Sequence, residues 1–83
     1  MNETIRELLK KHGGLQVDVD ALDGAADLYA AGLSSFASVQ LMLAIEERFD
    51  IEFPDTLLNR KSFQSVDAIA RTVSSIVDDR KVA

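Results

Sequence analysis

The residues best placed to do chemistry form the run Gly32-Leu33-Ser34-Ser35-Phe36-Ala37-Ser38, which separates a glycine turn from a strongly apolar segment. An exposed serine hydroxyl at the start of a helix can serve as a nucleophile, if a base activates it, or as the attachment point of a phosphodiester. The second chemistry suits this position, because free backbone N–H groups and the positive end of the helix dipole stabilise a phosphate. Gly32 has no Cβ and leaves room for a modifying enzyme to reach Ser35. The local sequence alone favours a third role, since most serines before a helix are ordinary N-caps.

Catalysis by this serine is not expected. A catalytic serine needs a base and an orienting acid. The only histidine, His12, falls at the end of a predicted helix next to Gly13, where a partial positive charge is favourable. The run around Ser35 lacks the second glycine of a nucleophile elbow, and 83 residues are too few for a hydrolase sheet. We predict that the protein is not an enzyme.

Two acidic stretches, Asp18-Val19-Asp20 and Asp23-Gly24, suggest a calcium loop. The spacing argues against it, because the third ligand position would be Leu22 and the closing glutamate position would be Tyr29. The chain has no cysteine, which excludes disulfides and cysteine-based zinc sites. We therefore expect no metal and a solvated acidic loop.

The composition describes one small folded domain spanning residues 1–83, with 47% hydrophobic and 28% charged residues. The formal net charge of −5 disfavours binding to nucleic acid, which needs a basic surface. No run approaches the length of a membrane span, and residues 1–11 are amphipathic with mixed charge instead of having an apolar signal region. We expect a cytoplasmic monomer that does not bind membranes.

The amino-terminal half contains the first elements that must position the serine. A first helix is predicted from Thr4 to His12, with Thr4 and Glu7 as a capping box and Gly13-Gly14 as the stop signal. An ordered loop with scattered apolar residues follows, from Gly14 to Ser34. Ser34 or Ser35 then caps a second helix that runs to about Phe49 and ends before Pro54.

The carboxyl-terminal part completes an all-α pattern. A short helix is predicted after Pro54, to about Arg60. Ser65 is the expected cap of a final helix with a regular apolar face, made of Val66, Ile69, Ala70, Val73, Ile76 and Val77. The tail, residues 78–83, is expected to fray. The predicted fold is a small bundle of three main helices and one short helix.

The second helix has apolar residues on two sides when it is placed on a helical wheel. The side predicted to face the core carries Ser38, Leu41, Met42, Ile45 and Phe49. The opposite side carries Phe36, Val39 and Leu43, interleaved with Gln40, Glu46 and Glu47. This second side either is buried, as in a core helix, or forms a docking surface edged with carboxylates. A bundle of this size has little room to bury both sides, which favours docking.

Residues 27–54 resemble the acyl carrier protein family. The ordered motifs that carry the resemblance are Asp27-Leu28-Tyr29, Gly32-Leu33, Ser35-Phe36, Val39, Leu41, Ile45-Glu46-Glu47 and Phe49-Asp50-Ile51-Glu52-Phe53-Pro54. In the family the same order reads Asp-Leu, Gly, Asp-Ser-Leu, Val-Glu-Leu, Glu-Glu-Phe and an Ile-x-Pro ending. The resemblance implies that Ser35 carries a 4′-phosphopantetheine whose thiol holds an acyl group as a thioester. It also implies that partner enzymes contact Phe36, Val39, Gln40, Leu43, Glu46 and Glu47.

Several positions depart from the family pattern near the serine. Ser34 replaces the usual aspartate, Phe36 replaces leucine, and Ala37 and Gln40 stand where acidic residues are common. Fewer negative charges flank Ser35, which puts a role in fatty-acid synthesis in doubt. The chain is most similar to stand-alone carriers that accept an amino acid from a ligase resembling seryl-tRNA synthetase.

The resemblance implies three kinds of partner: a phosphopantetheinyl transferase, the loading ligase and a downstream enzyme that accepts the acyl group. The alternative from a different class is a helical interaction module that carries no prosthetic group. Replacing Ser35 by alanine distinguishes the two, because only a carrier would lose its function.

Overall fold

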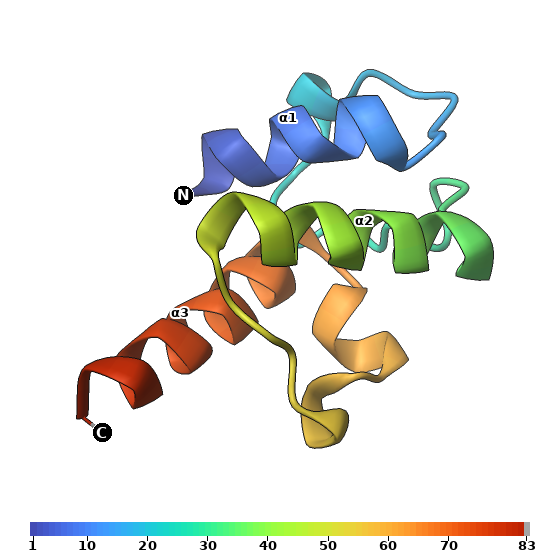
Figure 1. The fold of residues 1–83 in the computed structure, drawn as a ribbon. Helices are drawn as coiled ribbons and strands as arrows, with labels where there is room; N and C mark the ends of the chain where they lie inside the picture. Colours follow the sequence, from blue (N-terminus) through green and yellow to red (C-terminus); the bar gives the residue numbers. More distant parts are fainter. Residues whose placement is uncertain (83) are drawn as a thin grey trace.

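A computed structural model describes the backbone of residues 1–82 and the side chains of residues 1–79. Its helices are α1 (Asn2–His12), α2 (Ser35–Phe49) and α3 (Val66–Val82), and its 3₁₀ turns are η1 (Val19–Ala21), η2 (Asp55–Leu57) and η3 (Arg60–Phe63). Helices α1 and α2 run side by side, and α3 lies at an angle to both (Figure 1). No strand occurs in residues 1–82, so the predicted all-α bundle is confirmed.

Helix α1 is the central element, because it packs against both α2 and α3. Its buried side chains are Ile5, Leu8 and Leu9. The predicted capping box is wrong: the N-cap is Met1, without a side-chain hydrogen bond, and the Ile5 N–H donates to the Met1 carbonyl at 3.1 Å. Thr4 and Glu7 lie inside the helix, where the Glu7 carboxylate instead pairs with Lys11 at 3.4 Å, one turn further along.

The predicted stop after α1 is observed. The Gly13 N–H donates to the Leu9 carbonyl at 2.8 Å, and Gly14 has a left-handed backbone with φ of 65°. Glycine adopts this conformation at little cost, so the chain reverses here.

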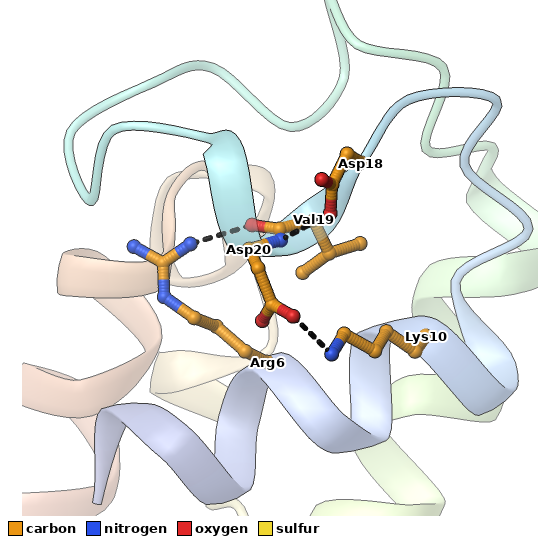
Figure 2. Close-up of polar contacts among 5 residues, drawn as sticks. All are labelled: Arg6, Lys10, Asp18, Val19 and Asp20. Atoms are coloured by element: carbon orange, nitrogen blue, oxygen red, sulfur yellow. Dashed lines mark hydrogen bonds and ion pairs between the residues drawn. The ribbon is translucent and has the colours of Figure 1, made fainter.

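The long loop after α1 is ordered by contacts with α1 (Figure 2). The Arg6 guanidinium donates to the Val19 carbonyl at 2.6 Å, and Lys10 forms an ion pair with Asp20. The Asp18 carboxylate accepts the backbone N–H of Asp20 at 3.0 Å, which caps η1. The Val19 side chain is buried in the hydrophobic core. The acidic residues considered for a calcium loop therefore hold the loop itself.

Helix α2 buries the side that the sequence pattern predicted. Leu41 and Ile45 have no exposed surface, while Met42 and Phe49 are half-buried and pack against the same core. The helix ends at Phe49, as predicted, because Asp50 takes a left-handed conformation with φ of 52°. The N–H of Asp50 donates to the Glu46 carbonyl in this C-cap.

The segment between α2 and α3 forms two 3₁₀ turns, η2 and η3, where one short helix was predicted. Asn59 interrupts the segment with an extended backbone and caps η3, its side-chain oxygen accepting the Ser62 N–H at 3.0 Å. The Phe53 and Phe63 rings pack at a centroid distance of 5.3 Å and anchor both ends of the segment in the core.

Helix α3 begins after Ser65, whose hydroxyl accepts the Ala68 N–H at 3.0 Å, as the predicted cap requires. Val66, Ile69, Val73 and Ile76 are buried. The helix continues to Val82, through most of the tail expected to fray, and Ala83 lies outside the described residues. Among residues 1–82, none of the helices has the length and apolar character needed to cross a membrane.

Candidate functional site at the amino end of α2

The two serines at the start of α2 have different roles. Ser34 has an extended backbone, and its hydroxyl oxygen accepts the Ala37 N–H at 3.0 Å. Ser34 is therefore the N-cap, and Ser35 is the first helical residue. The Ser35 side chain is exposed, and its hydroxyl has no hydrogen-bond partner among the described side chains. Of the two hydroxyl groups, that of Ser34 is therefore engaged in the cap and that of Ser35 is not.

The loop before α2 is held by the Asp27-Leu28 pair of the carrier-like motif. The Asp27 carboxylate accepts the N–H groups of Tyr29 and Ala30, at 2.9 and 3.3 Å. Leu28 is fully buried, and its N–H donates to the Gln64 carbonyl at 2.7 Å. The first residues of the motif therefore tie this loop to the segment before α3.

Gly32 lies in the turn that connects this loop to Ser34. Its φ is 116°, a conformation that residues with a Cβ rarely adopt. Space is not what requires glycine here, because the nearest atom to an added Cβ would be Leu15 Cδ2 at 4.0 Å. The backbone conformation is therefore the reason for glycine at this position.

A groove of about 400 Å³ opens beside Ser35. It lies between the first half of α2 and the segment that contains η3. The residues that line it are Tyr29, Ser35, Ser38, Val39, Met42, Leu58, Asn59, Arg60 and Phe63. The groove is mostly apolar, with Ser35 on its wall.

The described lining of the groove carries one positive charge and no negative charge. Among the described residues that line the groove, Arg60 is the only charged one, and its guanidinium carbon lies 4.1 Å from the centroid of the Tyr29 ring. This is a cation–π distance. The first turn of α2 contains no acidic residue, so its N–H groups face no carboxylate of their own turn. The site therefore suits an anionic group on Ser35.

The opposite side of α2 is exposed, which excludes the alternative that α2 is buried all round. Phe36, Val39 and Leu43 are 65%, 50% and 51% exposed, and Gln40 and Glu47 are exposed between and beside them. We call the five residues Phe36, Val39, Gln40, Leu43 and Glu47 the docking stripe. An exposed apolar row of this kind is the surface feature that the predicted docking side requires.

Glu46, the sixth residue predicted to face partners, has an internal contact. Its carboxylate is half-buried, and Oε2 accepts the Phe53 N–H at 2.8 Å. This hydrogen bond holds the loop that follows α2. The sequence pattern missed this role because it depends on a residue beyond the end of the helix.

The sequence analysis named Ser35 and Val39 as site residues but missed the other residues of the groove. Tyr29 lies before α2, Leu58 and Arg60 lie after it, and only the folded chain brings them to Ser35. Arg60 could have been noticed as a cation at the end of the predicted short helix, but no spacing rule connects it with Tyr29.

Comparison with known proteins identifies the family. Residues 3–73 match the family described as "Phosphopantetheine attachment site". The chain belongs to this family of phosphopantetheine-binding carrier proteins. The resemblance drawn from residues 27–54 is therefore confirmed, and phosphopantetheine is the group that the family carries.

Individual relatives point the same way. The chain is 66% identical over 83 residues to the aminoacyl carrier protein of Agrobacterium fabrum, which covers 100% of both chains. It also matches a chain in the crystal structure of an engineered Bradyrhizobium japonicum glycine:[carrier protein] ligase complexed with carrier protein from Agrobacterium tumefaciens and AMP. That match has a TM-score of 0.87 and 70% identity, and covers 89% of this chain and 99% of that chain.

A more distant structure is that of the Bradyrhizobium japonicum glycine:[carrier protein] ligase complexed with glycylated carrier protein. It is similar with a TM-score of 0.73 and 30% identity, over 86% of this chain and 95% of that chain.

Proposed function

We propose that this carrier protein holds an amino acid on a phosphopantetheine attached to Ser35 and presents it to partner enzymes. The observation that carries the assignment of the site is the division between the two serines: Ser34 caps α2, and Ser35 presents a free hydroxyl beside Gly32. The family match supports the attached group, and the aminoacyl and glycylated relatives support the cargo.

The residues around Ser35 fit the group. The amino end of α2 offers N–H groups to a phosphodiester, Arg60 adds a positive charge, and no described acidic residue lines the groove. When attached, the group supplies a thiol, which this cysteine-free chain lacks, to hold the acyl group as a thioester.

Ser35 takes part in one covalent step. Its Oγ forms a bond to the phosphorus next to the pantetheine of coenzyme A, and the pyrophosphate P–O bond breaks. The adenosine bisphosphate leaves with the bonding electrons, and the hydroxyl proton passes to a base on the phosphopantetheinyl transferase. The chain needs no base of its own for this step, in agreement with the proposal that it has no catalytic activity.

Partner enzymes are proposed to meet the docking stripe. The exposed apolar side chains of Phe36, Val39 and Leu43 would enter a groove of the partner, and Glu47 would face its basic residues. The partners are the transferase, the ligase that loads the amino acid, and a downstream enzyme that accepts it. The glycine:[carrier protein] ligase complexes support the ligase as a class, and its resemblance to seryl-tRNA synthetase stays a prediction. We place these reactions in the cytoplasm, with the carrier as a monomer.

The deciding experiment is intact-mass measurement after incubation with coenzyme A and a broad-specificity phosphopantetheinyl transferase. The parent and Ser34→Ala should each gain one phosphopantetheine, whereas Ser35→Ala should gain none. A gain by Ser35→Ala would contradict the site. No gain by the parent with several transferases would favour the unmodified interaction module instead.

The identity of the acyl group is tested next, with the protein that already carries phosphopantetheine. A glycine:[carrier protein] ligase and ATP should add an amino acid to the modified parent, and hydroxylamine should release it as expected for a thioester. Acylation by fatty acyl ligases alone would contradict the amino-acid cargo.

A further inference from the structure

The Arg60 guanidinium and the Ser35 hydroxyl border the same groove, although the two residues lie on different elements. We propose that Arg60 is a positioning residue that binds the phosphodiester on Ser35 and keeps the pantetheine in this groove. This inference rests on the proposed function, because it needs the group on Ser35. It adds a binding site within the protein for the phosphodiester and the pantetheine, the part of the prosthetic group (the arm) that does not carry the thioester.

In the unmodified protein, the Arg60 side chain is already positioned against Tyr29. Tyr29 supports the guanidinium at 4.1 Å from its ring centroid, and Asp27 holds the backbone of Tyr29 through the 2.9 Å hydrogen bond. Asn59 orders the backbone beside Arg60, because its side-chain oxygen accepts the Ser62 N–H at 3.0 Å and its amide donates to the Thr56 carbonyl at 3.1 Å. A side chain that already packs against a ring on an ordered backbone loses less rotamer freedom on binding than a free one.

The Arg60 guanidinium is also free of anionic partners. Among the side chains of residues 1–79, none of the carboxylates lies within ion-pair distance of it. Its central carbon lies over the Tyr29 ring, and its N–H groups donate no hydrogen bond to any other described residue. A guanidinium edge matches the oxygens of a phosphate, so a phosphodiester on Ser35 supplies the partner that the folded chain does not.

The walls of the groove fit the next part of the arm. Val39, Met42 and Leu58 present apolar surface, which suits the gem-dimethyl group and the methylenes of pantetheine. The described lining residues include no carboxylate that could pair with the ammonium group of a bound amino acid. The aminoacyl end therefore stays in water, within reach of a partner enzyme, while the phosphate end is held.

The test is NMR spectroscopy of the modified protein, with mass spectrometry confirming modification first. In the parent, the gem-dimethyl protons should show NOEs to the methyl groups of Val39 and Leu58. The Tyr29 amide signal should also shift between the unmodified and modified forms. Arg60→Gln should lose these NOEs and most of the shift. Arg60→Lys should retain part of both, because a lysine still binds a phosphate as a point charge.

Lys61→Gln is the matched control, since Lys61 is the exposed neighbour and does not line the groove. It changes the net charge equally and should leave the NOEs intact. Thermal melts of the unmodified variants should coincide with that of the parent. Loss of the NOEs in a variant would then reflect loss of the binding site for the phosphodiester and not loss of the fold.

The outcomes distinguish this inference from the proposed function. Normal modification with no NOEs in the parent, or with equal NOEs in the parent and Arg60→Gln, would overturn the role of Arg60 and leave the carrier function standing. Loss of the NOEs in Lys61→Gln as well would also overturn it, because general charge would then explain the effect. Failure of the parent to be modified would overturn both.

Discussion

The Glu46 carboxylate accepts the backbone N–H of Phe53 at 2.8 Å and joins the last turn of α2 to the loop that follows it. Phe53 is buried and packs on Phe63, so this hydrogen bond helps to set the path of the chain toward the groove. Glu47, the next residue, is exposed and has no comparable contact among the described side chains. Adjacent glutamates of similar chemistry therefore serve different purposes.

This contrast gives a prediction for stability. Glu46→Ala should lower the free energy of unfolding by about 1 kcal/mol, because it leaves the Phe53 N–H without its charged acceptor at a half-buried position. Glu47→Ala should change it by less than about 0.5 kcal/mol, as for an ordinary surface residue. Urea unfolding of both variants measures the difference. Equal effects would show that the Phe53 hydrogen bond does not stabilise the fold.

The different contacts of Ser34 and Ser35 give a second prediction, which compares the stability of their alanine variants. Ser34→Ala removes the N-cap hydrogen bond to Ala37 and should cost about 1 kcal/mol of stability. Ser35→Ala should leave the stability nearly unchanged, since its hydroxyl holds no described contact. Circular dichroism melts of the two unmodified variants provide the measurement. A larger loss in Ser35→Ala would mean that Ser35, and not Ser34, caps α2.

The buried and exposed sides of α2 give a third prediction, which concerns both stability and binding. Leu41→Ala should cost about 2–5 kcal/mol, because Leu41 is fully buried. Phe49→Ala should cost less than Leu41→Ala, since Phe49 is only half-buried. Leu43→Ala should cost little stability but weaken binding to the loading ligase, which calorimetric titration with the ligase would show. Unchanged binding would remove Leu43 from the docking stripe.

Gly32 supplies a fourth prediction. Gly32→Ala forces a Cβ into a backbone with φ of 116° and should cost about 1–3 kcal/mol. Gly14→Ala is the control, because its φ of 65° lies in the left-handed helical region that other residues enter at a smaller cost. Denaturant melts should rank Gly32→Ala as the more damaging. The reverse order would indicate that the loop before Ser34 relaxes without cost.

Much of the fold could be predicted from local patterns. The apolar spacing of α3 and the buried side of α2 were correct because period and burial agree in these helices. The Thr4–Glu7 capping box was wrong because its pattern is short and fits inside a helix as well as at its start. Burial of Ile5, one turn after Met1, accompanies a helix that begins earlier.

The site could be predicted only in part. The motif order predicted Ser35 as the attachment site, whereas the choice between Ser34 and Ser35 as the cap of α2 needed the extended backbone of Ser34. The contact between Arg60 and Tyr29 could not be foreseen, because it joins irregular segments from opposite sides of α2 in the sequence. Patterns reveal residues that share one helix, whereas grooves are made by segments that meet through the tertiary fold.

The cap on Ser34 has a consequence for modification of the carrier. Because the hydroxyl that caps α2 is not the one proposed to react, the helix keeps its first side-chain hydrogen bond whether Ser35 is bare or modified. Attachment of the group at Ser35 therefore does not require the helix to give up its cap, and the bare and modified proteins can share one fold.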